Sequence, residues 1–176
     1  MLLALSDTHG TDDTRLTDHL REQIRAADTV VHAGDFTTPA VLEAFEGLAG
    51  EFLAVRGNAD TAAVRKRLPA TASAETLGYR FLVVHGHEHD GTSLSLLARQ
   101  EGADVVVLGH THRPVVGRLG GVTVLNPGSH ADPRGNHPAY AAVGQASGDV
   151  VVRLRTPDGE TVERRSLSEG RTGRRT

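Results

Sequence analysis

The amino-acid sequence predicts an α/β fold in which two β-sheets pack face to face and helices cover their outer faces. Through the first two thirds of the chain, short apolar runs alternate with segments of helical periodicity. The last third consists of short strands joined by Gly-containing turns. A chain of 176 residues is long enough for one substantial core. We therefore expect a single domain over residues 1–168 and a disordered basic tail over residues 169–176.

Strands and helices alternate in the first part of the chain. Strands are expected at residues 2–6, 28–32 and 51–55, because each is a short apolar run typical of a buried strand. Thr11 or Asp12 would cap the first helix, which runs to about residue 27. Thr38 caps the second helix and Pro39 begins it, since proline is well tolerated in a first helical turn. A short basic helix follows the third strand and ends at Pro69.

The helical pattern continues once more and then stops. A hairpin is predicted over residues 75–84, a helix around residues 92–100 and a buried strand over residues 103–108. Further strands are expected at residues 114–119, 122–125, 140–146, 150–155 and 161–166. Gly120-Gly121, Ser147-Gly148-Asp149 and Pro157-Asp158-Gly159 mark turns between them, so this part of the chain is predicted to be a β meander.

Five of the predicted strands are followed directly by side chains that can bind a metal ion. In chain order, these side chains are Asp7, His9, Asp35, Asn58, His85, His110 and His112. Loops at the ends of strands are where α/β sheets place their functional groups. We therefore expect the seven side chains to share one edge of the fold.

The chemistry of these side chains suits two metal ions. A carboxylate can bridge two cations, an imidazole offers one neutral nitrogen, and an Asn carbonyl is a neutral oxygen donor. Mixed nitrogen and oxygen ligands without thiolate favour Mn, Fe, Co, Ni or Zn. Seven donors are too many for one ion and suit two ions that share a carboxylate. Two neighbouring cations can activate a water and bind an oxyanion, as they do in phosphatases and nucleases.

Composition excludes several other classes of protein. The chain has no Cys, which excludes disulfides and thiolate sites. No apolar run approaches the roughly 20 residues of a membrane span. Met1 leads directly into a strand, so we predict no signal peptide and expect a cytoplasmic protein. A formal net charge of −3 gives no general attraction for nucleic acid.

The order of the motifs resembles that of the calcineurin-like metallophosphoesterase superfamily. Asp-x-His, Gly-Asp, Gly-Asn, His and Gly-His-x-His occur in that order, and the resemblance covers about residues 1–155. The small size and the stretch Asn126-Pro127-Gly128-Ser129 resemble the compact single-domain branch. That branch includes the YfcE and MJ0936 phosphodiesterases and the retromer subunit Vps29. The resemblance implies a four-layer αββα sandwich of two mixed β-sheets and the hydrolysis of phosphodiesters.

The resemblance also assigns roles by position. It implies a first ion held by Asp7, His9, Asp35 and His112, and a second held by Asp35, Asn58, His85 and His110, with Asp35 as the bridge. Asp35, Asn58 and His85 are the residues implied to be catalytic, and a hydroxide between the ions would attack in line with the leaving oxygen. Mn²⁺ is the expected ion, with Ni²⁺, Fe²⁺, Co²⁺ and Zn²⁺ as alternatives.

The resemblance bears on partners as well. It implies a small phosphodiester or nucleotide-type substrate, and a homodimer or homotetramer is compatible with it. A phosphomonoesterase and a non-catalytic scaffold like Vps29 are the alternative functions. Because both Asp residues, the Asn and all four His ligands are present, the sequence favours an enzyme over a scaffold.

One position departs from the pattern of the superfamily. Many relatives have Gly-Asn-His-Glu, whose His is a general acid for the leaving group, whereas this chain has Ala59 at that position. An alanine cannot donate a proton, so the proton must come from water or another group, or the substrate must have a good leaving group. We expect a slow enzyme or one that prefers diesters. His87 and His130 are candidate proton donors, and each is alternatively a supporting or surface residue.

Several further polar residues are candidates for supporting roles. Asp60 either accepts a hydrogen bond from a ligand residue or caps the helix after it. Asn126 and Ser129 are expected to shape the loop beside the ions. Arg56 and Arg134 are either phosphate-binding or ordinary surface residues, and His89 is expected to be exposed to solvent.

Overall fold

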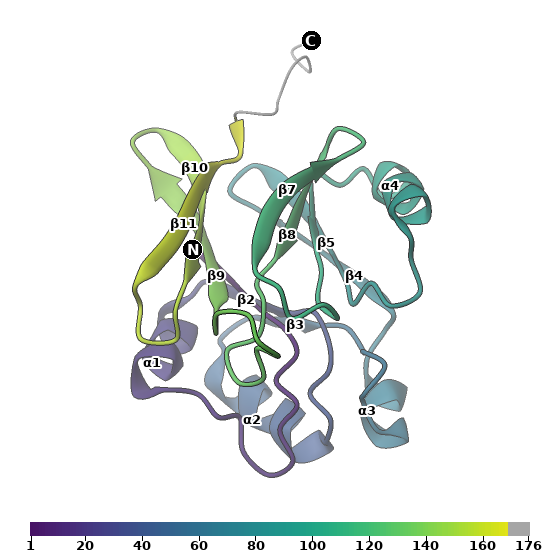
Figure 1. Cartoon of the computed structure of the whole chain (residues 1–176), viewed down its shortest axis with the longest axis vertical. Coiled ribbons are helices and arrows are strands. Elements are labelled where there is room, and N and C mark those ends of the chain that lie inside the picture. Colours follow the sequence, from purple (N-terminus) through teal and green to yellow (C-terminus); the bar gives the residue numbers. More distant parts are fainter. Residues whose placement is uncertain (169–176) are drawn as a thin grey trace.

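The computed structural model describes residues 1–168 and consists of two β-sheets with helices on their outer faces (Figure 1). The helices are α1 (Asp18–Ala26), α2 (Pro39–Leu48), α3 (Ala62–Arg67) and α4 (Gly91–Gln100). The strands are β1 (Leu2–Leu5), β2 (Thr29–His32), β3 (Phe52–Ala54), β4 (Thr71–Thr76), β5 (Tyr79–Val84), β6 (Val105–Val107), β7 (Val115–Leu119), β8 (Val122–Asn126), β9 (Tyr140–Ala146), β10 (Asp149–Arg155) and β11 (Thr161–Ser166).

Both sheets are mixed. The six-stranded sheet has the order β11-β10-β9-β1-β2-β3, with β1, β2 and β3 parallel and β9 antiparallel to β1. The five-stranded sheet has the order β4-β5-β6-β8-β7, with β5, β6 and β8 parallel. The prediction that the strands of the last third form a single meander is therefore wrong. The hairpin of β7 and β8 completes one sheet, and β9 to β11 complete the other, because residues 127–139 cross between the sheets.

The alternation of side chains along the strands creates the layers. Leu2 and Ala4 of β1 point into a core between the two sheets, where they meet residues of β5, β6, β9 and β10. Leu3 and Leu5 point to the opposite face, where they pack with apolar residues of α1, α2 and α3. On the far side, Leu94 and other residues of α4 cover the outer face of β5 and β6. The predicted four-layer αββα sandwich is confirmed.

The first helix begins later than predicted. Thr17, and not Thr11 or Asp12, is the N-cap of α1, and its Oγ1 accepts the backbone N–H of Leu20 at 3.2 Å. Thr11, Asp12 and Thr17 are all of the residue types that cap helices, so composition alone does not choose between them. Leu16 is buried although it precedes the helix, because it packs with Leu20 and Ile24 of α1 in the core beneath the six-stranded sheet.

Other predicted elements are close to those observed. Thr38 caps α2, and Pro39 is its first residue, as predicted. The hairpin of β4 and β5 turns at Leu77 and Gly78, but β4 begins at Thr71, earlier than predicted. The predicted basic tail lies outside the described residues. Within residues 1–168, no helix has the length and apolar character needed to cross a membrane.

The parallel strands of the two sheets end at one common edge. The backbone N–H of Asp7, after β1, donates to the carbonyl of Gly34, after β2, at 3.0 Å. In the other sheet, the backbone N–H of Gly109, after β6, donates to the carbonyl of His85, after β5, at 3.1 Å. The predicted ligand residues belong to these loops.

Candidate metal centre

The structure brings all seven predicted ligand residues to one cluster. Asp7 and His9 follow β1, Asp35 follows β2, Asn58 follows β3, His85 follows β5, and His110 and His112 follow β6. Asp7, Asp35, His85 and His112 are buried, His9 is half-buried, and Asn58 and His110 are exposed. The cluster is therefore enclosed by the loops after β1 and β2 and open to solvent beside the exposed pair.

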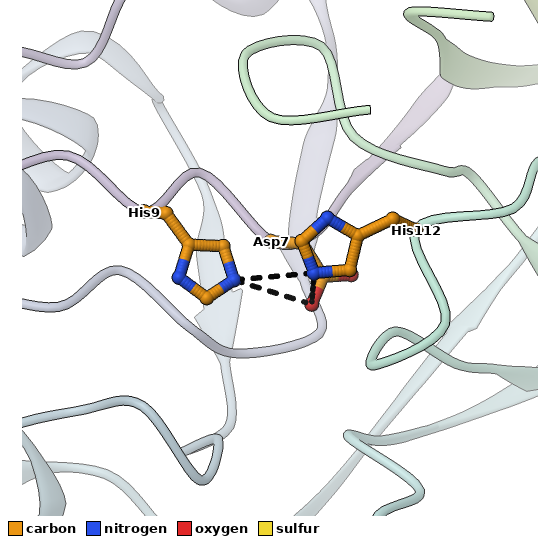
Figure 2. A group of neighbouring side chains, drawn as sticks. All are labelled: Asp7, His9 and His112. Carbon is orange, nitrogen blue, oxygen red and sulfur yellow. Dashed lines mark hydrogen bonds and ion pairs between the residues drawn. The ribbon is translucent and has the colours of Figure 1, made fainter. Parts of the chain in front are cut away.

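Asp7, His9 and His112 form a first group of converging side chains (Figure 2). Asp7 and His9 come from the loop after β1, and His112 comes from the loop after β6. His112 Nε2 lies 3.2 Å from His9 Nε2 and 3.4 Å from Asp7 Oδ1. His9 Nε2 lies 4.0 Å from the same carboxylate oxygen. Ligand atoms that bind one ion at about 2.1 Å are separated by about 3 to 4 Å, so this spacing fits a shared cation.

Asn58, His85 and His110 form a second group. Asn58 Oδ1 lies 3.1 Å from His85 Nε2 and 2.9 Å from His110 Nδ1. An amide oxygen and two ring nitrogens therefore meet at one point, although they come from three different loops.

Asp35 lies between the two groups. Its Oδ2 is 3.4 Å from His9 Nε2 in the first group and 3.3 Å from His85 Nε2 in the second. Its other oxygen, Oδ1, accepts the backbone N–H of Ala59 at 2.7 Å, which fixes the orientation of the carboxylate. One carboxylate oxygen thus faces ligand atoms of both groups.

Backbone carbonyls orient two of the imidazoles. The Nδ1–H of His85 donates to the carbonyl of Ala33 at 2.7 Å, and the Nδ1–H of His112 donates to the carbonyl of Asp132. In each ring the proton on Nδ1 leaves Nε2 with a free lone pair directed at the carboxylates. This arrangement is typical of metal-binding histidines, whose other nitrogen is held by a carbonyl or carboxylate.

The ligand loops have an unusual backbone conformation. Asp7, His9, Asp35, His110 and His112 have positive φ angles of 54°, 46°, 62°, 67° and 56°. For residues with a Cβ, the left-handed region costs roughly 1–2 kcal/mol each. The loops also approach each other closely, because a Cβ on Gly57 would lie 2.1 Å from Asp35 Oδ1. This position requires a glycine.

Asp60 holds two of the ligand loops together. This carboxylate is 3% exposed and accepts the backbone N–H groups of Gly57 at 2.7 Å, Thr37 at 2.8 Å and Asp35 at 3.2 Å. It does not cap α3, whose N-cap is Thr61. Of the two predicted roles, the structure therefore supports the hydrogen bond to a ligand residue.

His32, at the end of β2, is a supporting residue that the sequence analysis missed. Its Nδ1 accepts the backbone N–H of Gly34 at 3.2 Å, so its Nε2 carries the proton and donates to Thr8 Oγ1 at 2.9 Å. Burial holds the pKa of His32 well below its usual range and keeps the ring neutral. The ring thus ties the loop of Asp7 to that of Asp35. In the sequence, the feature that could have indicated this role is the position of His32, three residues before Asp35.

Asn126 and Ser129 shape the loop beside the cluster, as predicted. Asn126 Nδ2 donates to the carbonyl of Gly109 at 2.8 Å. Ser129 Oγ donates to the carbonyl of Asp7 at 2.6 Å and accepts the backbone N–H of Asp132 at 2.8 Å. The loop between β8 and β9 is therefore fastened to the loops of both β1 and β6.

The charged groups of the cluster shift one another's pKa values. Burial raises the pKa of Asp7 and lowers that of His9. For Asp35, burial raises the pKa, but the hydrogen bond and charge of His85, together with the N–H of Ala59 and the charge of His9, hold the pKa below its usual range. For His85, burial lowers the pKa. The hydrogen bond and charge of Asp35, together with the charge of Asp7 and the carbonyl of Ala33, outweigh burial and raise the pKa. The carboxylate of Asp35 and the imidazole of His85 therefore stabilise each other's charged forms.

The two candidate proton donors lie in different environments. His87 is exposed, and its ring centroid lies 5.3 Å from that of His85 and 6.1 Å from that of His110. His130 is instead buried, with Nε2 2.9 Å from the carbonyl of Thr14 and its ring against the edge of Phe45. His87 therefore remains a candidate, whereas His130 is part of the core beneath the six-stranded sheet.

The remaining candidates differ in their distance from the cluster. Arg134 Nη2 lies 3.5 Å from His9 Nε2. Arg56 is half-buried and donates from Nη1 to the carbonyl of Leu68 at 3.4 Å. His89 is half-buried, so it is less exposed to solvent than predicted. Its backbone N–H donates to the carbonyl of Gly86 at 3.2 Å.

The donor set fits divalent cations. Four imidazoles, two carboxylates and one amide oxygen are the ligand types that borderline divalent ions such as Mn²⁺, Fe²⁺ and Zn²⁺ accept. The buried carboxylates of Asp7 and Asp35 supply negative charge that a cation would neutralise. One oxygen of the Asp35 carboxylate lies near a ring nitrogen of each group.

Comparison with known proteins agrees with this chemistry. Residues 1–149 match the family model described as the calcineurin-like phosphoesterase superfamily domain. A probable metallophosphoesterase of Methanothermobacter thermautotrophicus is 33% identical over 170 residues, covering 94% of this chain and 91% of that protein. Phosphodiesterase MJ0936 of Methanocaldococcus jannaschii is 31% identical over 144 residues, covering 70% of this chain and 80% of that protein.

A solved structure shares the fold. Vps29 from Entamoeba histolytica, complexed with Zn²⁺, superposes with a TM-score of 0.74 at 22% identity and covers 94% of this chain and 98% of that one. At this identity the likeness concerns the fold alone. The resemblance predicted from the order of the motifs is confirmed, including the small branch that contains MJ0936 and Vps29.

Proposed function

The chain belongs to the calcineurin-like phosphoesterase superfamily, and we propose that it is a phosphodiesterase with a dinuclear metal centre. The observation that carries this proposal is the position of Asp35, one oxygen of which lies 3.4 Å from His9 Nε2 and 3.3 Å from His85 Nε2. Two groups of ligand atoms that share a carboxylate oxygen suit two neighbouring ions.

The two groups define which residues would hold each ion. Asp7, His9, Asp35 and His112 would hold the first, and Asp35, Asn58, His85 and His110 the second. When bound, two divalent ions supply a lowered pKa for the attacking water and neutralise charge on the phosphate. We propose Mn²⁺ as the ion on the resemblance to the superfamily. The donors combine carboxylate and amide oxygens with imidazoles and include no thiolate, so they suit Ni²⁺, Fe²⁺, Co²⁺ and Zn²⁺ as well.

The residues of the chain would prepare this chemistry in distinct ways. Asp35, fixed by the backbone N–H of Ala59, would hold the two ions at one spacing. Asn58 lies on the open side of the cluster, where a substrate can approach. His85, held by the carbonyl of Ala33, would keep its Nε2 lone pair aimed at the second ion. These are the three residues to which we assign catalytic roles.

The substrate class follows from the missing proton donor. Ala59 offers no acidic group next to Asn58, so the reaction favours leaving groups that depart without strong acid assistance. We propose small phosphodiesters, nucleotide-type esters among them, as the substrates. His87, whose ring centroid lies 5.3 Å from that of His85, is the side chain best placed to assist the leaving group.

The test is hydrolysis of a chromogenic phosphodiester and of the corresponding monoester. Metal-stripped protein is titrated with Mn²⁺, with Ni²⁺ and Zn²⁺ in parallel, while bound metal is measured on the same samples. We expect metal-dependent cleavage in which the diester exceeds the monoester. The stripped protein and Asp35→Asn serve as inactive controls.

The other outcomes point to different functions. Preferred cleavage of the monoester would identify a phosphomonoesterase and overturn the substrate class. Absence of activity with every metal, at two bound ions per chain, would overturn the enzyme and favour a scaffold role.

A further inference from the structure

We propose that Arg134 binds the phosphate of the substrate beside the first group of ligands. This inference rests on the proposed function and names a residue that recognises the charge of the phosphodiester. Arg134 is not one of the seven predicted ligands and comes from a different segment, the loop between β8 and β9.

Arg134 lies next to the cluster with its guanidinium oriented. Its Nη2 is 3.5 Å from His9 Nε2, and its Nε donates to Asp132 Oδ2 at 3.2 Å. The side chain is 57% exposed, so a substrate in solvent can reach it. An arginine held at Nε by a carboxylate keeps the outer N–H groups of its planar fork available for another anion.

The loop that carries Arg134 is anchored to the ligand residues. Asp132, which orients Arg134, also accepts the Nδ1–H of His112 at its backbone carbonyl. The backbone N–H of Asp132 donates to Ser129 Oγ, which in turn donates to the carbonyl of Asp7. The guanidinium is therefore positioned by the same residues that position two ligands of the first ion.

The contact between Arg134 and His9 places a guanidinium N–H group beside the nitrogen that would bind the first ion. Nε2 of His9 has one lone pair, which can accept a hydrogen bond from Nη2 or bind an ion, but not both. When His9 is a ligand, the N–H groups of Nη2 are free to donate to another acceptor close to the ion. A phosphate oxygen is such an acceptor and would form a charge-assisted hydrogen bond.

The chain offers a closely matched control for this residue. Arg165, on β11, is 59% exposed and donates from Nε to Glu163 Oε1 at 2.8 Å, so it is also paired with the carboxylate two residues before it. Strand β11 carries none of the ligand residues. Arg165→Ala therefore reproduces the loss of charge and of a local ion pair away from the cluster.

The experiment measures phosphate binding separately from catalysis. Calorimetry determines the Kd of inorganic phosphate for the Mn²⁺-loaded wild type, Arg134→Ala, Arg134→Lys and Arg165→Ala, after Mn²⁺ binding has been measured for each. Hydrolysis of the chromogenic diester gives KM and kcat for the same four proteins.

We expect Arg134→Ala to bind phosphate about 10- to 100-fold more weakly, the size of one charge-assisted hydrogen bond. Its KM for the diester should rise, and its Mn²⁺ affinity should stay within about twofold of the wild type. The phosphate affinity of Arg134→Lys should lie between those of the wild type and Arg134→Ala, because lysine keeps the charge without the planar fork. Arg165→Ala should match the wild type.

Two results overturn the proposal. One is equal phosphate affinity in Arg134→Ala and Arg165→Ala, and the other is loss of Mn²⁺ binding in Arg134→Ala, which would make the residue a support for the ion site. If the wild type cleaves no diester, the proposed function fails. The phosphate titration still decides whether Arg134 binds the anion.

Discussion

The carboxylate of Asp60 accepts the backbone N–H of Asp35 at 3.2 Å, so a buried side chain from the loop after β3 fixes a ligand residue in the loop after β2. The same carboxylate accepts the N–H groups of Thr37 and Gly57. Three backbone N–H groups, from the loops after β2 and β3, therefore share one side chain as their acceptor.

Replacing Asp60 should damage both stability and ion binding. In Asp60→Ala, the buried N–H groups of Asp35 and Gly57 and the partly buried N–H of Thr37 lose their acceptor. Each loss at a buried group costs about 1–3 kcal/mol. We expect the free energy of unfolding to fall by about 3 kcal/mol in urea denaturation. Calorimetry should show Mn²⁺ affinity reduced about 10- to 100-fold, as for other residues that support ligands. Asp12→Ala, at an exposed position, is the control. Unchanged ion affinity in Asp60→Ala would refute this role.

The shared oxygen of Asp35 predicts a difference in metal content between two variants. Asp35→Asn removes the charge of the residue that faces both groups of ligands, so we expect it to retain neither ion. Asn58→Ala removes a donor from the second group alone and should retain about one ion per chain. Equilibrium dialysis against Mn²⁺ followed by elemental analysis measures both. Full metal content in Asp35→Asn would show that the bridging assignment is wrong.

His130 should make the stability of the metal-free protein sensitive to acid. Burial lowers the pKa of His130 to about 4, while the unfolded chain has a His pKa of about 6.5. Between these values the unfolded state binds the extra proton, so the stability present above pH 6.5 is lost as the pH falls toward 4. Between pH 7.5 and pH 5, this one group contributes a loss of about 2 kcal/mol.

Unfolding in urea at these two pH values tests the contribution of His130. In His130→Gln, whose amide can still donate to the carbonyl of Thr14, the loss of stability should be about 2 kcal/mol smaller than in the wild type. His137→Gln, at an exposed position, should behave as the wild type does. The buried His32, whose pKa is also lowered by burial, should leave part of the acid sensitivity in place. An identical loss in His130→Gln and the wild type would contradict the prediction.

The close approach at Gly57 predicts that one methyl group disrupts the ion site. A Cβ at this position would lie 2.1 Å from Asp35 Oδ1 and 2.6 Å from its backbone nitrogen, so Gly57→Ala must displace the shared carboxylate. We expect at least a tenfold loss of Mn²⁺ affinity in calorimetry, with the circular dichroism of the sheets unchanged. Gly47→Ala, in α2 with open space around its Cβ, should instead add about 0.5–1 kcal/mol of stability. Equal ion affinity in these two variants would exclude a steric role for Gly57.

Much of the ligand cluster could be predicted because its residues follow a regular rule. Asp7, Asp35 and His85 each come directly after a short apolar run, and parallel strands bring their carboxyl ends to one edge. The residue types alone then indicate mixed nitrogen and oxygen ligation. Two sheets with helices on their outer faces could likewise be predicted, because apolar runs alternate with segments of helical periodicity. That residues 1–168 form one domain stays a prediction.

The hydrogen-bond partners of the supporting residues could not be predicted, since they come from distant parts of the chain, although Asn126 and Ser129 were expected to shape the loop. Ser129 acts through a hydrogen bond to Asp7, 122 positions away in the chain. Asp132 was not a candidate at all, because its carbonyl and carboxylate serve two different side chains in a folded loop. His130 follows a strand as the ligand histidines do, yet it enters the core, and only its contact with Thr14 distinguishes it.

The left-handed backbone at five of the predicted ligand residues makes these positions costly in stability. Each such residue costs roughly 1–2 kcal/mol, and the total is comparable to the 5–15 kcal/mol by which a typical domain is stable. A descendant that no longer needed ions could place Gly or Asn at these positions and gain stability without altering either sheet. Loss of the chemistry would thus be thermodynamically favoured. Keeping Asp and His at these five positions therefore costs stability that neither sheet requires.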